Sequence, residues 1–267
     1  MILYTKKDNR ADLPQSAKRY LLRYKNINLD ESNLICIAGR PGMGKTSFAL
    51  HLAQEYAKNS NKSVFIFSLE LSAQQIYNRL LIAMANVDTY TFREQLCTDA
   101  ETERVESAKQ QISKYSLIID DTPLLTPEQI EKKVGKIENI GMLIIDYFQL
   151  LWPNQENDNR EREYEEIAFK LKQLSREKGI PVIIASHLPR YVEYRKDKRP
   201  LLSDLTGTGV PAQIMDTVCL IYREGYYDID SDNDTADIII AKNQYGCCGV
   251  LPFEWQGKYM KFVERDS

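Results

Sequence analysis

Residues 34–47 read LICIAGRPGMGKTS, and this stretch decides the fold. An apolar run, 34–38, leads into the pattern G-x-x-x-x-G-K-[ST], and a helix is expected over residues 46–58. The glycines let backbone N–H groups surround phosphate oxygens, and the helix N-terminus adds its dipole. A simple glycine turn would not require strand, loop and helix together. The stretch therefore predicts a site for ATP with Mg²⁺, made of Gly39, Arg40, Pro41, Gly42, Met43, Gly44, Lys45, Thr46 and Ser47.

Within this motif, two side chains have distinct expected roles. Lys45 supplies a point charge to the terminal phosphates, and the Thr46 hydroxyl is a ligand of Mg²⁺. We therefore expect Lys45 in catalysis as well as in binding.

Further apolar runs alternate with helical segments, which is typical of a parallel sheet with crossover helices. Helix starts are marked by Ser72 with Gln75 and by Thr126 with Gln129, and a helix is expected over residues 160–178. The late runs suggest an antiparallel extension after a loop of little regular pattern, residues 187–216. The expected strands are 34–38, 64–69, 117–119, 142–145, 182–185, 217–222, 237–241 and 259–263.

The chain of 267 residues suits one large α/β domain, predicted over residues 33–267, preceded by a polar arm over residues 1–32. The arm contains an amphipathic stretch at residues 16–24 that could pack on its own domain or on a neighbour. No apolar run is long enough for a membrane helix and no secretion signal is evident, so we expect a cytoplasmic protein without a membrane partner. The five cysteines show no zinc-ligand spacing.

Carboxylates follow two of the expected strands, and Mg²⁺ requires one of them. Asp146 ends a clean buried run, whereas Asp120 and Asp121 run into a turn before a helix, so the pattern favours Asp146 modestly. Glu70 also ends a strand, where it could activate water or simply be a solvated terminus. His187 could sense the γ-phosphate or could bond nearby backbone.

A basic segment follows His187. Residues 190–199 hold five basic and two acidic side chains interleaved with two tyrosines. Basic charge with aromatic rings suits single-stranded nucleic acid, and the net charge of −3 does not exclude such a local patch. A solvated charged loop is the commoner explanation of such a run, so this signal alone is weak.

Several of these segments, in this order, resemble the C-terminal ATPase domain of DnaB-type replicative helicases. The resemblance runs from about Leu34 to Val263 and rests on GRPGMGKTSFAL, FSLELS, LIIDDTPLLTPEQI, LIIDYFQLL, DKRPLLSDL, IIIAKNQYG and GKYMKF. It implies a RecA-like P-loop fold with a mostly parallel twisted sheet.

The resemblance also implies roles for single residues. Glu70 would be the catalytic carboxylate, Asp146 the magnesium-linked aspartate and His187 the γ-phosphate sensor, while Asp120 and Asp121 would be structural. Bacterial members usually carry glutamine at the sensor position, and histidine there is similar to phage primase–helicases. The loop from residue 190 to 213 would face single-stranded DNA in the channel of a hexameric ring, through Arg190, Arg195, Lys196, Lys198, Arg199 and Gly209.

Three features depart from the family pattern. The family's Lys-x-Arg motif, which reaches the ATP of the neighbouring subunit, reads Lys242-Asn243-Gln244, so the lysine remains and the arginine finger does not. The arginine of the channel loop is replaced by Thr206. The N-terminal helical domain of the family has no counterpart in this sequence, so we expect either a piece of a longer protein or a paralogue that works without that domain.

These observations leave three hypotheses. The first is an ATP-driven DNA helicase motor domain that translocates on single-stranded DNA in replication, with other replication proteins as further partners. The second is a hydrolysis-impaired paralogue that binds DNA or regulates a helicase, which Gln244 and Thr206 favour. The third, a RecA-type or circadian-clock-type ATPase, is disfavoured by the DKRPLLSDL stretch.

Overall fold

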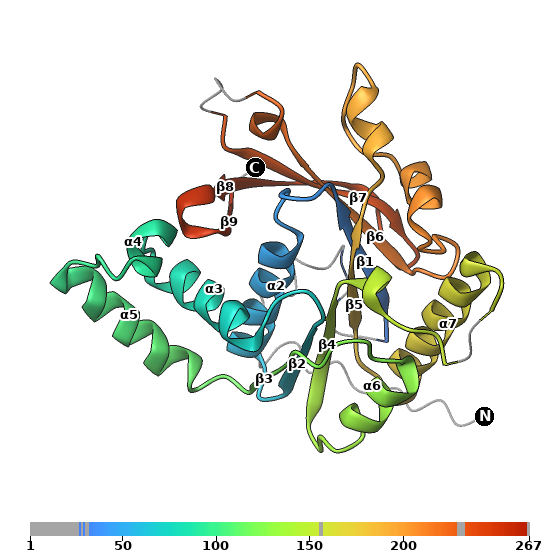
Figure 1. Cartoon of the computed structure of the whole chain (residues 1–267), viewed down its shortest axis with the longest axis horizontal. Coiled ribbons are helices and arrows are strands. Elements are labelled where there is room, and N and C mark those ends of the chain that lie inside the picture. The colour runs from blue at the N-terminus through green and yellow to red at the C-terminus, as the bar shows by residue number, and fades with distance from the viewer. Residues whose placement is uncertain (1–26, 28, 30–31, 155–156, 229–232, 266–267) are drawn as a thin grey trace.

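A nine-stranded sheet forms the centre of the protein in the computed structural model, which describes residues 27, 29, 32–154, 157–228 and 233–265 (Figure 1). The strand order is β3-β2-β4-β5-β1-β6-β7-β8-β9. The pairs from β3 to β6 are parallel and those from β6 to β9 are antiparallel. The predicted parallel sheet with an antiparallel C-terminal extension is confirmed. The strands are β1 (Leu34–Gly39), β2 (Ser63–Ser68), β3 (Leu117–Asp120), β4 (Ile140–Asp146), β5 (Val182–His187), β6 (Thr217–Arg223), β7 (Thr235–Asn243), β8 (Gly249–Gln256) and β9 (Lys261–Glu264).

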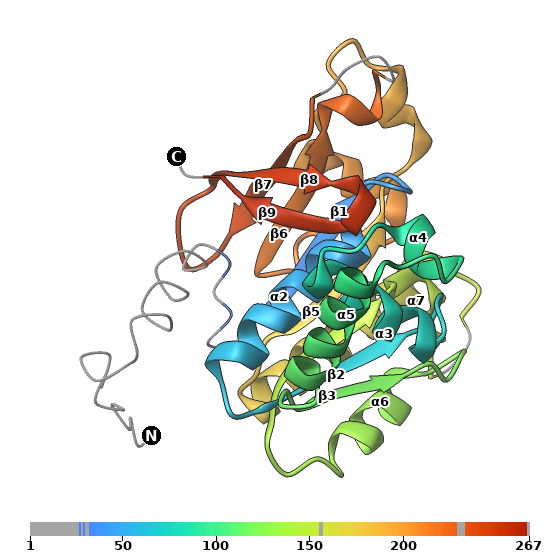
Figure 2. The same cartoon turned by 90° about the vertical axis from the view of Figure 1, so that its left-hand side faces the viewer.

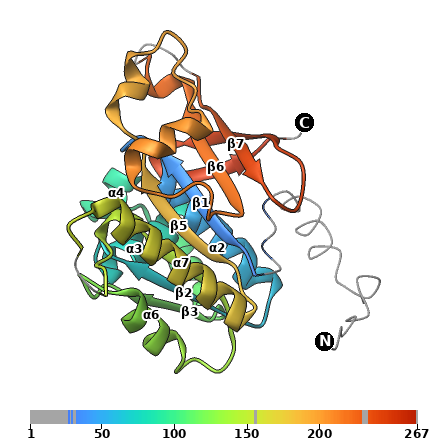
Figure 3. The same ribbon diagram turned by 90° about the vertical axis from the view of Figure 1, so that its right-hand side faces the viewer.

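Helices cover both faces of the sheet. Helices α2, α3 and α5 lie on one face (Figure 2), and α6 and α7 lie on the other (Figure 3). The helix starts predicted at Ser72 and Thr126 are confirmed as complete capping boxes. The helices are α2 (Lys45–Asn59), α3 (Ala73–Ala85), α4 (Thr89–Arg93), α5 (Asp99–Ile112), α6 (Pro127–Val134) and α7 (Arg160–Lys178), with short 3-10 helices η2 (Phe148–Leu150), η3 (Arg190–Tyr194), η4 (Leu202–Thr208), η5 (Glu224–Tyr226) and η6 (Gly257–Tyr259).

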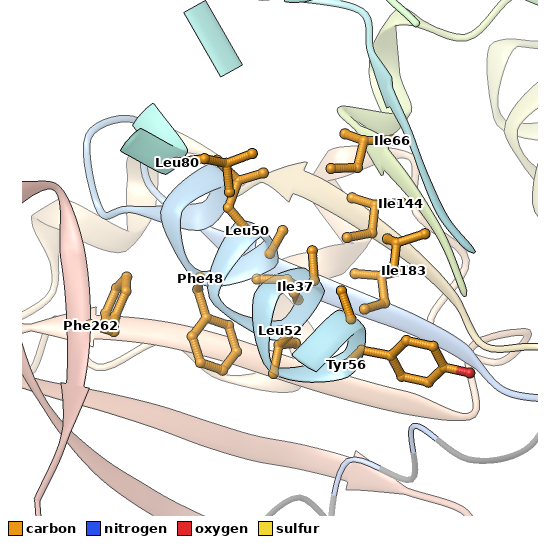
Figure 4. Packing of buried hydrophobic residues seen from close by; sticks show 14 of the residues in the cluster. Ile37, Phe48, Leu50, Leu52, Tyr56, Ile66, Leu80, Ile144, Ile183 and Phe262 are labelled. Atoms are coloured by element: carbon orange, nitrogen blue, oxygen red, sulfur yellow. The ribbon is translucent and has the colours of Figure 1, made fainter. Parts of the chain in front are cut away.

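The sheet separates two hydrophobic cores. Because successive side chains of a strand point to opposite faces, β1 sends Ile35 and Ile37 into one core and Cys36 into the other. Figure 4 shows the first core, where Phe48 of α2 lies close to Phe262 of β9, with their ring centroids 5.5 Å apart. The C-terminal strand thus packs on the helix that follows the glycine loop.

The sequence prediction missed one strand and displaced another. Strand β8 was not predicted, because Gly249 and Pro252 interrupt its apolar pattern. The last strand was expected to begin at Tyr259, but this residue ends η6, and β9 starts at Lys261. The loop expected over residues 187–216 contains η3 and η4.

Part of the predicted arm packs on the domain. Ile27 and Leu29 are both buried in the core beneath α2. The amphipathic stretch predicted at residues 16–24 lies outside the described residues.

Candidate nucleotide and nucleic-acid sites

Parallel register gathers the polar candidates at one edge of the sheet. Gly39 at the end of β1 pairs with His187 at the end of β5, and Ser68 at the end of β2 pairs with Asp146 at the end of β4. Glu70 follows Ser68 by two residues. Ligands of open α/β sheets bind outside the carboxyl ends of the strands, so register alone brings these side chains to the binding edge.

A cavity of about 290 Å³ lies at this edge. Its lining contains the predicted residues Pro41, Gly42, Gly44, Lys45, Thr46, Ser47, Glu70, Asp146 and His187, together with Leu71, Arg79, Trp255 and Met260, which the sequence interpretation did not single out. Lys242 is not among the lining residues. Its Nζ donates to the carbonyl oxygens of Ala212 and Gln213, at 2.8 and 3.2 Å.

The glycine loop takes a shape that only glycine tolerates at one position. Gly44 has φ of +97°, and a Cβ there would lie 2.9 Å from the ring of Phe262 and 3.1 Å from Trp255. Helix α2 begins at the next residue. The first turn of this helix therefore opens directly onto the cavity, which suits an anion.

Lys45 is buried at the floor of the loop. Its Nζ donates to the carbonyl oxygens of Gly39 and Arg40, each at 3.1 Å. Burial lowers the pKa of Lys45 to about 8, against the opposing attraction of Asp146 and Glu70. An arriving phosphate would compensate this burial and favour the charged ammonium.

Thr46 and Asp146 form the part of the site that fits a hard cation. The Thr46 hydroxyl donates to Oδ2 of Asp146 at 2.6 Å, and Asp146 is 3% exposed. Burial raises the pKa of Asp146, while the bond from Thr46 and the charge of Lys45 oppose that rise. Hydroxyl and carboxylate oxygens are the donors Mg²⁺ prefers, so these two residues would hold the ion.

Glu70 and Arg79 face the same charges. Glu70 is exposed, and its charge acts on Lys45, Asp146 and Arg79. Burial lowers the pKa of Arg79, and the attraction of Asp146 and Glu70 opposes the change. Arg79 is thus a cation of this site. The sequence interpretation missed Arg79 because an arginine in a helix is ordinary. Its one available signal was its position between Ile76 and Leu80, two residues of the buried face of α3.

His187 is neutral at ordinary pH. Burial lowers its pKa to about 4, and the nearby charges of Lys45 and Arg40 add to this shift. Its ring lies edge-on to Tyr147, with centroids 4.3 Å apart. Within the described part of the chain, its Nδ1 is buried and has no hydrogen-bond partner. That nitrogen does not form the backbone bond that was the alternative interpretation.

Arg223 and Trp255 form a flat surface beside the glycine loop. The guanidinium lies 4.5 Å from the centroid of the indole ring and donates to the carbonyl oxygen of Gly42 at 3.0 Å. Burial lowers the pKa of Arg223 to about 10. A planar apolar group next to the phosphate site could stack here.

Asp120 and Asp121 have structural partners. Asp120 accepts from Lys133 at 2.5 Å and from the backbone N–H of Thr122 at 2.9 Å. Asp121 accepts from the N–H of Ala73 at 2.8 Å and so helps to cap α3. Neither residue lines the cavity described above.

The basic segment divides into engaged and exposed side chains. Arg195 donates to both carboxylate oxygens of Asp204, at 3.1 and 2.8 Å. Lys198 lies 4.8 Å from the ring centroid of Tyr227. Arg199 lies 4.7 Å from the ring centroid of Tyr222 and pairs with Asp237 at 2.5 Å.

Arg190 and Lys196 are exposed, as are the rings of Tyr191 and Tyr194. Gly209 has φ of +79°, and the ring of Tyr164 leaves no room for a Cβ. The exposed surface of this segment therefore presents Arg190, Lys196 and two aromatic rings, and Arg199 is exposed as well although it pairs with Asp237.

Comparison with known proteins identifies the family. The family described as "DnaB-like helicase C terminal domain" matches residues 23–264. The chain belongs to this family. The DnaB-like domain is 40% identical over 237 residues to the replicative DNA helicase DnaB of Geobacillus stearothermophilus, and 38% identical over 237 residues to the replicative DNA helicase DnaC of Bacillus subtilis (strain 168). Each alignment covers 87% of this chain and 52% of the relative, so the chain spans about half the length of these curated relatives.

Solved structures agree with the fold. A solved ATPase domain superposes with a TM-score of 0.83 at 32% identity, covering 88% of this chain and 86% of that one. A DnaB-like replicative helicase studied with its primase interactions also gives a TM-score of 0.83 at 32% identity, covering 89% of this chain and 58% of that one. The predicted RecA-like class is confirmed. Among the described residues of the DnaB-like domain, none of the helices has the length and apolar character of a membrane span.

Proposed function

We propose that this chain is the motor domain of an ATP-driven DNA helicase that moves along single-stranded DNA during replication. The single observation that carries the proposal is the cavity in which Lys45, Thr46, Glu70 and Asp146 converge. Family membership and the helicase relatives support the same assignment.

The arrangement supports hydrolysis of the terminal phosphate. Bound Mg²⁺ would neutralise negative charge on the β- and γ-phosphate oxygens. Lys45 binds those oxygens, Glu70 orients water and accepts its proton, and neutral His187 contacts the γ-phosphate. Arg79 offsets the negative charge near Glu70 and Asp146. The Arg223–Trp255 surface stacks the base.

Assembly and DNA binding belong to the same proposal. A hexameric ring would place Lys242 at the ATP of a neighbouring subunit and the exposed Arg190 and Lys196 in the channel. The solved relative described with primase makes a primase a reasonable replication partner. The cytoplasmic location expected from the sequence also belongs to this proposal.

ATP turnover with and without oligo-dT tests the motor function, alongside the mass of the assembly in solution. We expect DNA to stimulate turnover and Lys45→Ala to abolish nucleotide binding in calorimetry. Lys58→Ala is the matched control, because Lys58 is a largely exposed lysine of the same helix, with 57% of its side chain accessible. Unchanged ATP·Mg²⁺ affinity in Lys45→Ala would refute the site.

A second candidate function is a hydrolysis-impaired paralogue that binds DNA or regulates a helicase. Gln244 and Thr206 favour it, since both are exposed and neither carries the charge expected from the family resemblance. Gln244→Arg discriminates the two. An arginine finger is worth ~10³–10⁵ in rate, so turnover should rise strongly if rings form. Clear hexamers without any gain would contradict the finger argument, and low turnover without DNA stimulation would favour the paralogue.

A further inference from the structure

Arg40 connects the glycine loop to the basic segment. Its Nε donates to Oε1 of Glu193 at 2.8 Å, and its Nη1 donates to the carbonyl oxygen of Leu188 at 2.6 Å. The N–H of Leu188 in turn donates to the carbonyl oxygen of Gly39 at 3.1 Å. Three hydrogen bonds therefore join the start of the glycine loop to the residues just after His187.

The backbone of Arg40 contacts Lys45, the residue proposed to bind phosphate. Its carbonyl oxygen accepts from Nζ of Lys45 at 3.1 Å and from the N–H of Met43 at 3.2 Å. When Lys45 turns toward a phosphate, this carbonyl loses one of its two partners. Phosphate binding by Lys45 would therefore alter the hydrogen bonding of Arg40.

Glu193 contacts a cation of each segment. While Oε1 accepts from Arg40, Oε2 lies 3.9 Å from Nε of Arg190. Arg190 is largely exposed, with 77% of its side chain accessible, and it belongs to the surface proposed for DNA. One carboxylate therefore connects a glycine-loop cation with a cation of the basic segment.

The two contacts of Glu193, with Arg40 and with Arg190, differ in strength. The Arg40–Glu193 pair is partly buried, at 14% and 24% exposure, and its bond is short and charge-assisted. The Glu193–Arg190 contact is long and solvated, so it is the weaker link. A shift of Glu193 with Arg40 would release or attract Arg190 without disturbing the buried core.

Two anchors hold the segment on either side of Glu193. Buried Val192 anchors η3, and Arg195 fastens its end to Asp204. Between these anchors, Glu193 forms an ion pair with the glycine loop. Glu193 is therefore the position from which the loop can orient residues 190–196.

We propose that Glu193 is a positioning residue that transmits the nucleotide state from Arg40 to residues 190–196. This inference rests on the proposed nucleotide site and deepens the proposed function, because it names how ATP regulates the DNA surface. It assigns no chemistry to Glu193 itself.

Hydrogen exchange of residues 189–199 in the full chain tests the relay without DNA. The probe is a non-hydrolysable ATP analogue with Mg²⁺, at a concentration that calorimetry shows to be saturating. The analogue should change the exchange rate of these residues in the unmodified protein. Glu193→Ala should remove the change, and Glu193→Gln, which retains an oxygen acceptor, should keep part of it.

Glu106→Gln is the matched control, since Glu106 pairs with exposed Lys109 and neither residue lines the cavity. It should behave like the unmodified protein. A nucleotide response in Glu193→Ala equal to that of the unmodified protein would overturn the inference. So would a saturated nucleotide site with no response in residues 189–199.

Oligo-dT affinity with and without the analogue separates this inference from the proposed function. We expect the analogue to change DNA affinity in the unmodified protein by roughly 5–150-fold and to change it much less in Glu193→Ala. Absent DNA binding with an intact exchange response would refute the DNA function alone. If the analogue changed oligo-dT affinity equally in both proteins, the proposed role of Glu193 would be refuted.

Discussion

The nucleotide edge and the basic segment after β5 use their charged side chains differently. At the nucleotide edge, Lys45, Asp146 and Arg79 are drawn out of water into one cavity, and burial shifts the pKa of each. In the basic segment, Arg195 and Arg199 are neutralised by aspartates of the same chain. Concentrated, desolvated charge marks a site for chemistry, whereas paired charge marks a scaffold.

The largest expected effect is the loss of ATP hydrolysis when Glu70 at the nucleotide edge is replaced. Glu70→Gln keeps the size of the side chain but removes the base, so turnover should fall by ~10²–10⁴. ATP·Mg²⁺ affinity should stay near its original value, because Glu70 is exposed and does not hold the phosphates. Single-turnover kinetics and calorimetry measure the two quantities. If affinity were lost with the rate, Glu70 would be a binding group and the assigned role would be wrong.

The next largest effect concerns the paired arginines of the basic segment. Arg195→Ala leaves the carboxylate of Asp204, which is 2% exposed, without its cation, so the free energy of unfolding should fall by ~3 kcal/mol. Denaturant unfolding measures it. Arg199→Ala is the control, because its partly exposed pair with Asp237 should contribute only ~0.5 kcal/mol. Equal losses from the two variants would remove the distinction between buried and solvated pairs.

A pH series tests whether the charge of Lys45 controls nucleotide affinity. The pKa of Lys45 is about 8 in the free protein, and bound phosphate favours the ammonium and raises that pKa. Affinity for ATP·Mg²⁺ should therefore be highest and constant below pH 8, where Lys45 is charged. Above pH 8 it should fall by about tenfold per pH unit, until the pH reaches the pKa that Lys45 has in the complex. Calorimetry between pH 7 and about 10 measures the profile. An affinity of the unmodified protein that stays constant across this pH range would contradict the assignment of the titration to Lys45.

The smallest effect concerns the exposed part of the basic segment. Removing Arg190 and Lys196 together should weaken oligo-dT binding and lower its log–log salt slope by about 0.7 for each phosphate that the variant no longer neutralises. Lys109→Ala with Lys114→Ala, two exposed lysines on or just after α5, is the matched double control. An unchanged slope would place the DNA surface elsewhere.

Much of the nucleotide edge could be predicted because its signal is local. The glycine spacing fixes the loop, and continuous apolar runs fix the parallel strands whose ends gather Asp146, Glu70 and His187. The resemblance then chose between Asp146 and Asp120, and the contacts of Asp120 and Asp121 with Lys133 and Ala73 agree with that choice.

What the sequence did not predict depends on contacts between distant segments. Arg79 and Trp255 reach the cavity from α3 and β8, and nothing in their neighbours along the chain marks them. The engagement of Arg195 depends on Asp204, which only folding brings alongside it. A count of basic residues cannot distinguish a paired guanidinium from an exposed one.

Trp255 gives the protein a built-in optical reporter. The chain has two tryptophans, and only Trp255 lines the cavity beside Gly44, whereas Trp152 is 42% exposed at a different place in the fold. Emission from the indole at the cavity should change when an adenine ring arrives next to it. With Trp152 replaced by phenylalanine, nucleotide arrival and departure could be followed in real time without any attached dye.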